Sequence, residues 1–193
     1  MTQSRSDEPI YTIGHSTRTL EEFVAILRAF GVSIVADVRT IPRSRCNPQY
    51  AAGALRPALR RQGIRYAAVP ELGGLRRARS DSPNTAWRNA SFRGYADYMA
   101  TPPFAEGLSH VQALARGGTV ALMCAEAVPW RCHRSLVADA LVVRGVAVSE
   151  ITSGVRARPH SLTPWAEVEG LQITYPDSTA AREWRREAGT GRR

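Results

Sequence analysis

Short apolar runs alternate with amphipathic helical segments along most of this chain, and this alternation restricts the possible folds more than any other feature. The β-branched, apolar runs that indicate strands are residues 9–14, 33–38, 64–70, 119–124 and 146–151. Apolar residues at helical spacing separate them, most clearly in residues 19–31, 51–61, 101–118 and 131–145. Because neighbouring parallel strands need long crossover connections, the pattern predicts an α/β fold: a single domain with a mainly parallel open sheet of about five strands flanked by helices.

Chain length and composition favour one domain. The chain has 193 residues, which suits one core of ordinary size. We expect an N-terminal extension at 1–9, the α/β domain at 10–152 and a C-terminal extension at 153–193 that ends in a basic, disordered tail. No apolar stretch is long enough to cross a bilayer, and the first residues lack the apolar core of a secretory signal. We therefore expect a cytoplasmic protein without a membrane partner.

The positive charge of the chain indicates an anionic partner. The formal net charge is +9, and all 26 basic residues are arginine. Nucleic acid is therefore a possible partner, although a compositional bias can raise the arginine content without any selected partner. Arginine also binds phosphate and carboxylate in a bidentate manner, so we expect an anionic small molecule or a nucleotide as the ligand.

Polar residues follow three of the predicted strands at the point where each strand ends. Ligands of open parallel sheets bind at this edge, outside the carboxyl ends of the strands. Backbone amides that follow a glycine and precede a capped helix also suit an anion. We expect one shared edge for Gly14, His15 and Ser16, for Asp37 and Arg39, and for Cys124 and Glu126.

These residue types allow both proton transfer and anion binding. His15 and Glu126 are the candidate acid/base pair. Two alternatives stay open, because His15 could instead satisfy a buried hydrogen bond, and Asp37 and Arg39 could form a purely structural pair. The candidate substrate-binding residues are Gly14, Ser16, Asp37, Arg39, Ser44, Arg45, His133 and Arg134.

The segment LMCAEAVPWRCHR, residues 122–134, offers the most chemistry. Cys124 closes a buried strand, whereas Cys132 and His133 are expected in the first turn of the next helix. There the helix end and flanking arginines would favour a thiolate at Cys132. Either cysteine is a candidate catalytic nucleophile, and Cys124 could equally be a packing residue. A phosphatase loop is not indicated, because Trp130 stands where such a loop requires arginine.

A zinc site is the second hypothesis for this segment. Cys124, Cys132 and His133, together with His15 from the first strand end, are chemically suitable ligands. The spacing argues against it, because there is no Cys-x2-Cys pair and adjacent residues on a helix point about 100 degrees apart. A disulfide between the two cysteines is geometrically possible but lacks the spacing typical of redox exchange. The third cysteine, Cys46, lies beside an Asn-Pro turn and is expected to be structural.

Several of these motifs occur together and in order: YTIGHS, DVRTIPRSR, LGG, YADYM and MCAEAVPWRCHR. Over roughly residues 10–152 this ordered set resembles the domain of unknown function 488 family of bacterial and archaeal proteins. The resemblance implies an α/β fold but no particular reaction. It also implies a pocket at the matching positions Gly14, His15, Ser16, Asp37, Arg39, Ser44, Arg45, Glu126, Cys132, His133 and Arg134.

The leading hypothesis from the sequence is an enzyme, a hydrolase or transferase, that acts on a phosphate-bearing or nucleotide-like substrate. His15 and Glu126 would exchange protons, and Cys124 or Cys132 would be the nucleophile. The alternative is a non-catalytic nucleic-acid- or nucleotide-binding module, in which the arginines clamp phosphate and the cysteines only pack.

Overall fold

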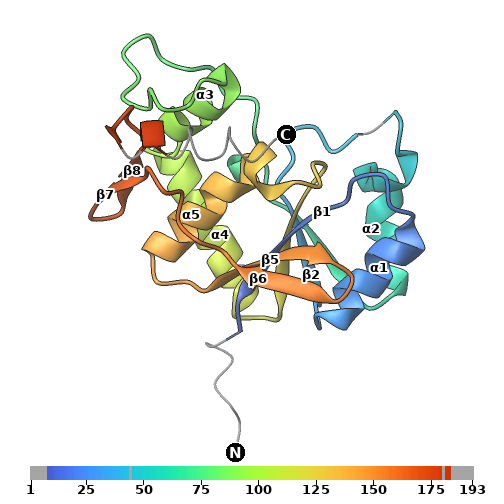
Figure 1. The fold of residues 1–193 in the computed structure, drawn as a ribbon. Coiled ribbons are helices and arrows are strands. Elements are labelled where there is room, and N and C mark those ends of the chain that lie inside the picture. Colours follow the sequence, from blue (N-terminus) through green and yellow to red (C-terminus); the bar gives the residue numbers. More distant parts are fainter. Residues whose placement is uncertain (1–7, 44, 180, 184–193) are drawn as a thin grey trace, which may run out of the picture.

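The computed structural model describes residues 8–43, 45–179 and 181–183, and a six-stranded sheet runs through its centre (Figure 1). The strands lie in the order β3-β2-β4-β1-β5-β6. The first five in this order pair in parallel and β6 pairs antiparallel to β5, so the predicted α/β fold with a mainly parallel sheet is confirmed. The strands are β1 (Ile10–Gly14), β2 (Ile34–Asp37), β3 (Arg65–Ala68), β4 (Val120–Cys124), β5 (Val148–Ser153) and β6 (Arg156–Pro159).

Helices cover both faces of the sheet (Figure 1). One core cluster joins one face of the sheet to α1 (Leu20–Ala29) and α2 (Ala52–Arg61). The other joins the opposite face to α3 (Ala90–Tyr98), α4 (Pro102–Ala115) and α5 (Arg134–Val143). Strand β4 shows the alternation behind this arrangement, because Ala121 and Met123 belong to the first cluster and Leu122 and Cys124 to the second.

The first helix begins where the sequence predicts. The Thr19 hydroxyl accepts a hydrogen bond from the Glu22 amide, and the Glu22 carboxylate accepts one from the Thr19 amide, which completes a capping box. Gly31 follows the helix in the left-handed region, with φ 64°, where glycine is favoured. Three short 3-10 helices connect other elements: η2 (Pro48–Tyr50), η3 (Pro70–Leu72) and η4 (Pro129–Arg131).

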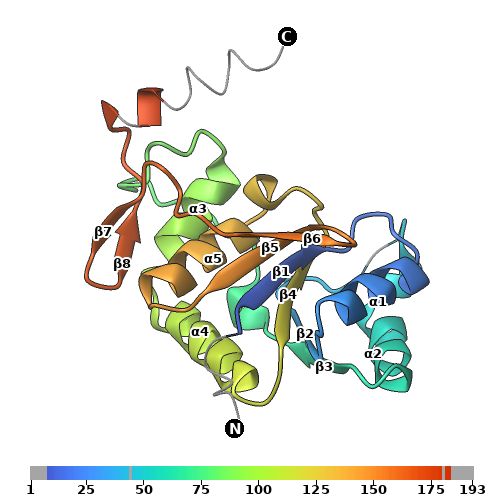
Figure 2. The ribbon, with the colours of Figure 1, turned by 60° about the horizontal axis from the view of Figure 1, so that its bottom comes forward.

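The part of the chain after residue 152 differs from the expected extension. Strand β6 joins the sheet, and a hairpin of β7 (Glu167–Glu169) and β8 (Gln172–Thr174) lies beside α3 and α5 (Figure 2). Trp165, Ile173 and Tyr175 are buried in the core cluster of α3, α4 and α5. The predicted boundary therefore cuts through packed structure, while most of the C-terminal segment 181–193 that holds the predicted basic tail, and most of the N-terminal extension, lie outside the described residues. None of the helices in the described ranges is long and apolar enough to span a bilayer.

Candidate functional site

A cavity of about 590 Å³ opens at the carboxyl edge of the sheet, where β1, β2 and β4 end. The strand register brings these ends together, since Gly14 pairs with Cys124 and Asp37 pairs with Met123. Six residues predicted from the sequence line the cavity: His15, Ser16, Arg39, Cys124, Glu126 and His133. Residues from the three strand ends therefore share one cavity.

Two thiols and an imidazole lie together beside this cavity. One donor atom each from Cys124, Cys132 and His133 lies within 4.8 Å of the other two. Cys132 has an extended backbone, with φ −126° and ψ 140°, and α5 begins only at Arg134. The expectation that Cys132 and His133 share a helical turn and point apart is therefore wrong, and the Cys132 sulfur lies 3.8 Å from Nδ1 of His133.

The hydrogen bonds of His133 fix which ring nitrogen faces the thiols. Nε2 of His133 lies 3.0 Å from the carbonyl oxygen of Val38. A carbonyl oxygen can only accept, so Nε2 carries a proton and Nδ1 is the ring nitrogen that faces the sulfur of Cys132. Gly74 leaves room for this ring, because a Cβ at that position would lie 3.0 Å from Nδ1. The LGG motif thus has a steric role at the site.

The thiol environment favours a thiolate at Cys124. The Cys132 S–H donates to the Cys124 sulfur, and this bond outweighs the effect of burial and lowers the pKa of Cys124 to about 5. The positive charge of Arg134 and a hydrogen bond from the backbone amide of Glu126 act in the same direction. The bond to Cys124 and burial both raise the pKa of Cys132. Cys132 precedes α5, so the helix-end argument for a thiolate at Cys132 does not apply, and the environment favours the thiolate at Cys124 instead.

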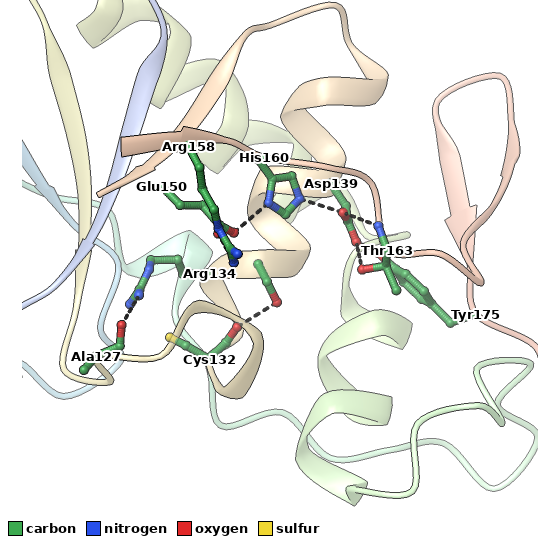
Figure 3. A network of polar contacts seen from close by, with 10 residues as sticks. Ala127, Cys132, Arg134, Asp139, Glu150, Arg158, His160, Thr163 and Tyr175 are labelled. Atoms are coloured by element: carbon green, nitrogen blue, oxygen red, sulfur yellow. Dashed lines mark hydrogen bonds and ion pairs between the residues drawn. The ribbon is translucent and has the colours of Figure 1, made fainter. Parts of the chain in front are cut away.

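Arg134 is fully buried and does not line the cavity. Its guanidinium donates to the carbonyl oxygens of Glu126, at 2.8 Å, and of Ala127, at 3.3 Å, and the latter bond is drawn in Figure 3. The predicted role as a substrate clamp is therefore wrong, because these bonds hold the backbone that follows β4. The charge of Arg134 is also one of the effects that lower the pKa of the Cys124 thiol.

Arg39 and Asp37 form the structural pair that the sequence left open. Two guanidinium nitrogens of Arg39 donate to the two Asp37 oxygens at 2.8 Å and 2.6 Å, and one also donates to the Tyr50 carbonyl oxygen. The remaining nitrogen lies 3.3 Å from Nε2 of His15. Arg39 lines the cavity, but most of its donors are already used by the protein, and Asp37 does not line it.

His15 is buried, and both of its ring nitrogens have partners. Nδ1 donates to the Ser16 carbonyl oxygen at 2.8 Å, which leaves Nε2 to accept from Arg39. The ring stacks on Tyr50 with centroids 4.0 Å apart. Burial lowers the pKa of His15, so the ring is neutral at neutral pH. These contacts match the alternative of a buried, hydrogen-bonded histidine and give no support to its predicted acid/base role.

Gly14 is required by a close approach of two backbone segments. A Cβ at Gly14 would lie 1.9 Å from the carbonyl oxygen of Glu126. The next two amides donate to the carbonyl oxygens of Cys124 and Ala125, both at 2.9 Å. The expectation that these amides grip an anion is therefore wrong, because they anchor the segment after β4 instead.

The remaining predicted residues divide into those on the cavity wall and those away from it. Glu126 is partly exposed on the wall, where its carboxylate accepts from the Val128 amide at 3.1 Å. Arg45 and Cys46 are exposed and do not line the cavity, and Ser44 lies outside the described residues. Sequence reasoning missed the lining residues Thr17, Thr40, Ile41, Asn47, Gly74, Leu75, Ala125 and Ala127. Of the two arginines in the PRSR motif, Arg43 lines the cavity and Arg45 does not.

Comparisons with curated proteins and with solved structures find no match. The comparison with protein-family models matches residues 19–141 to the family described as domain of unknown function DUF488. The matched range contains β2, β4, the thiol pair and most of α5, and it covers more than half of the 193 residues. The protein therefore belongs to the DUF488 family.

Proposed function

We propose that the protein is an enzyme, a hydrolase or transferase, in which the Cys124 sulfur attacks an anionic substrate bound in the cavity at the carboxyl edge of the sheet. The observation that carries this proposal is the position of Cys124. Its side chain lies at the end of β4, lines the cavity and is hydrogen-bonded by a second thiol. A thiolate, not a thiol, is the form of cysteine that attacks electrophiles.

The cavity wall fits a phosphate-bearing or nucleotide-like substrate. Arg43 is exposed on the wall, and Arg39, from the same loop after β2, also lines it. Hydroxyl groups of Ser16, Thr17 and Thr40 add neutral hydrogen-bonding groups to the same wall. Phosphate oxygens are commonly bound by arginine together with hydroxyl groups.

Each side chain of the site has a distinct role in this proposal. The Cys124 sulfur forms a bond to the electrophilic atom of the substrate, and the leaving group departs with the bonding electrons. Cys132 stabilises the thiolate by donating an S–H hydrogen bond to the Cys124 sulfur, and Nδ1 of His133, 3.8 Å from the Cys132 sulfur, is positioned to exchange a proton with that thiol. Glu126, the carboxylate on the wall, transfers a proton to the leaving group or takes one from water.

A metal centre is the second candidate, because Cys124, Cys132 and His133 form a donor set that could hold zinc with one position open to the cavity. The charge balance favours the thiolate instead. One thiolate neutralises the buried Arg134, whereas a divalent ion with two thiolates would leave that cation uncompensated. The binding-module alternative is weakened too, since Arg39 and Arg134 hold protein groups and not a ligand.

Protection from alkylation tests the proposal without knowledge of the substrate. The full chain is treated with iodoacetamide, and mass spectrometry follows modification of Cys124 with and without inorganic phosphate or adenosine monophosphate. We expect either anion to slow the modification, and we expect Arg43→Ala to remove the protection. Arg56→Ala is the matched control, because Arg56 is exposed on α2 and does not line the cavity.

Two results would contradict the proposal. If neither anion protects Cys124, or if protection is the same in Arg43→Ala, the cavity is not an anion site. If elemental analysis of untagged protein finds close to one zinc per chain and chelation is needed before Cys124 reacts, the metal centre replaces the thiolate.

A further inference from the structure

A second cavity, of about 450 Å³, shares no lining residue with the first and is lined by three tryptophans. Trp87 comes from the segment before α3, Trp130 from η4 and Trp165 from the segment between β6 and β7. These segments are far apart in the sequence. The rest of the wall is Ala86, Arg88, Asn89, Ser135, Glu150, Arg158, Pro159, His160, Ser161, Thr163 and Pro164.

The tryptophan rings present flat apolar surface to this cavity. The rings of Trp87 and Trp165 meet edge to face with centroids 5.3 Å apart, which fixes one wall. Trp130 is 56% exposed, and the guanidinium carbon of Arg158 lies 5.5 Å from its ring centroid. A large aromatic side chain that is exposed beside a cavity is suited to binding a planar ligand, because stacking would remove the exposed face of the side chain from water.

A buried polar network holds the wall in place before any ligand arrives (Figure 3). His160 lies between two carboxylates, with Nδ1 2.8 Å from Glu150 and Nε2 2.8 Å from Asp139. Asp139 also accepts from the Thr163 and Tyr175 hydroxyls, at 2.6 Å and 2.9 Å. Because the network ties the segment at 160–163 to α5 and β5, the wall does not have to be ordered by the ligand.

The charges around this cavity leave cations at its rim. Glu150 accepts from His160 with one oxygen and from Arg158 with the other, so its charge is compensated within the protein. Arg158 keeps a side chain that is 55% exposed, and Arg88 is exposed on the opposite wall segment. Arg158 donates to Glu150 through Nε and Nη2, so an anionic group at the rim would meet the exposed guanidinium of Arg88 and the remaining nitrogen, Nη1, of Arg158.

We propose that this second cavity binds an aromatic ring that carries a phosphate or carboxylate group. The ring lies against Trp130 and Trp87, and the anionic group is held by Arg158 and Arg88. The site does not include Cys124 and does not depend on the proposed reaction. A nucleotide and an aromatic carboxylate share this chemistry, so the test compares one example of each.

Isothermal titration calorimetry of the full chain is the test, with adenosine monophosphate and 4-hydroxybenzoate as the two probes. All titrations use the Arg43→Ala variant, so that binding in the first cavity does not enter the signal. We expect at least one probe to bind. We also expect Trp130→Ala, added to this background, to weaken binding about tenfold or more, since stacking on one aromatic side chain is typically of that size. Trp130→Phe should retain part of the affinity because it keeps a ring.

Arg158→Gln should weaken the same probe because it removes one rim cation, while Leu171→Ala should have no effect. Leu171 is the matched control, since it is exposed between β7 and β8 and does not line the cavity. Adenosine, ribose 5-phosphate and 4-hydroxybenzyl alcohol each lack the ring or the charge and should bind more weakly than their parent probe.

The proposal is overturned if neither probe binds, or if binding is unchanged in both Trp130→Ala and Arg158→Gln. Binding of ribose 5-phosphate equal to that of the nucleotide would show that the ring is not recognised. Equal binding of adenosine and adenosine monophosphate would show that the charged group is not recognised. A failure here leaves the alkylation result at Cys124 untouched, because that readout belongs to the first cavity.

Discussion

Two of the buried cations in this protein, Arg134 and His160, lie beside different kinds of acidic group. Arg134 bonds two backbone carbonyls and lies near a thiol pair, whereas His160 lies between the carboxylates of Asp139 and Glu150. Carboxylates are already ionised at neutral pH in an unfolded chain, so their attraction to His160 stabilises the fold. A thiol is mostly protonated at neutral pH in an unfolded chain, so the positive charge of Arg134 instead favours the ionised, reactive form of Cys124. The same element, α5, carries Arg134 and Asp139 and so supports both regions.

The His160 region should show the largest loss of stability on substitution. Asp139→Ala removes the acceptor of His160, Thr163 and Tyr175 and leaves a buried cation without one of its two partners. We expect the free energy of unfolding in urea to fall by about 3–5 kcal/mol, as for other broken buried ion pairs. The matched control is Asp81→Ala, which breaks the exposed pair with Arg79 and should change stability far less. Similar losses in the two variants would contradict a structural role for the network.

The two regions should also give opposite dependences of stability on pH. Bonds to Asp139 and Glu150 outweigh burial and raise the pKa of His160 to about 9 from about 6.5 in an unfolded chain. The contribution of His160, roughly 3 kcal/mol, is therefore complete below about pH 6.5 and is lost as the pH rises through about 9. The difference in unfolding free energy between the native sequence and His160→Asn should shrink over this window.

The contribution of Cys124 to stability changes with pH in the opposite direction, because the pKa of its thiol is lowered in the folded protein. Its contribution is present above the unfolded thiol pKa of about 8.5 and is lost as the pH falls through the folded value of about 5. The difference in unfolding free energy between the native sequence and Cys124→Ser should therefore grow as the pH rises from about 5 to about 8.5. Parallel trends in the His160 and Cys124 comparisons would show that the two regions do not differ as proposed.

Removal of the second thiol should have the largest effect on reactivity. Cys132→Ala deletes the donor that lowers the pKa of Cys124, and we expect alkylation of Cys124 near pH 6 to slow about tenfold or more, the size of a hydrogen bond to a charged group. Cys132→Ser keeps a donor in nearly the same place and should retain most of the rate. Equal rates in the alanine and serine variants would mean that Cys132 does not stabilise the thiolate.

A smaller effect is expected from the buried arginine. Arg134→Met removes the positive charge but keeps an unbranched side chain, and we expect a several-fold slower alkylation of Cys124 near pH 6. Arg131→Met removes a charge from exposed η4 and serves as the control. Circular dichroism of each variant separates loss of reactivity from loss of fold. If the folded Arg134→Met variant is alkylated at the native rate, the charge of Arg134 does not contribute to the reactivity of Cys124.

The sequence predicted elements with strong local signals. The α1 capping box and the buried runs of β1, β2 and β4 are as predicted, and parallel pairing then brings three strand ends to one edge. Strand β6 was missed because Arg156–Pro159 has no apolar alternation and forms only by pairing with β5. Its position as an edge strand also explains how it tolerates arginine and proline.

Tertiary placement decides the parts of the site that the sequence did not predict. Pro129 begins a 3-10 helix, which delays α5 to Arg134 and lets Cys132 turn toward Cys124. Arg134 reads as an exposed residue in a first helical turn, yet the segment after β4 folds over it. Asp139 and His160 were not identified because each is an isolated polar residue, 21 positions from the other, without a motif.

The measurement that tests the central claim most directly is the rate of Cys124 alkylation in the native sequence as a function of pH, followed by mass spectrometry with N-acetylcysteine as the reference thiol. The account predicts that the rate is already close to its plateau at pH 7, with an inflection near the lowered pKa of Cys124, about 5. An inflection near the ordinary thiol pKa of about 8.5 would contradict it, because Cys124 would then be a buried thiol and not a nucleophile.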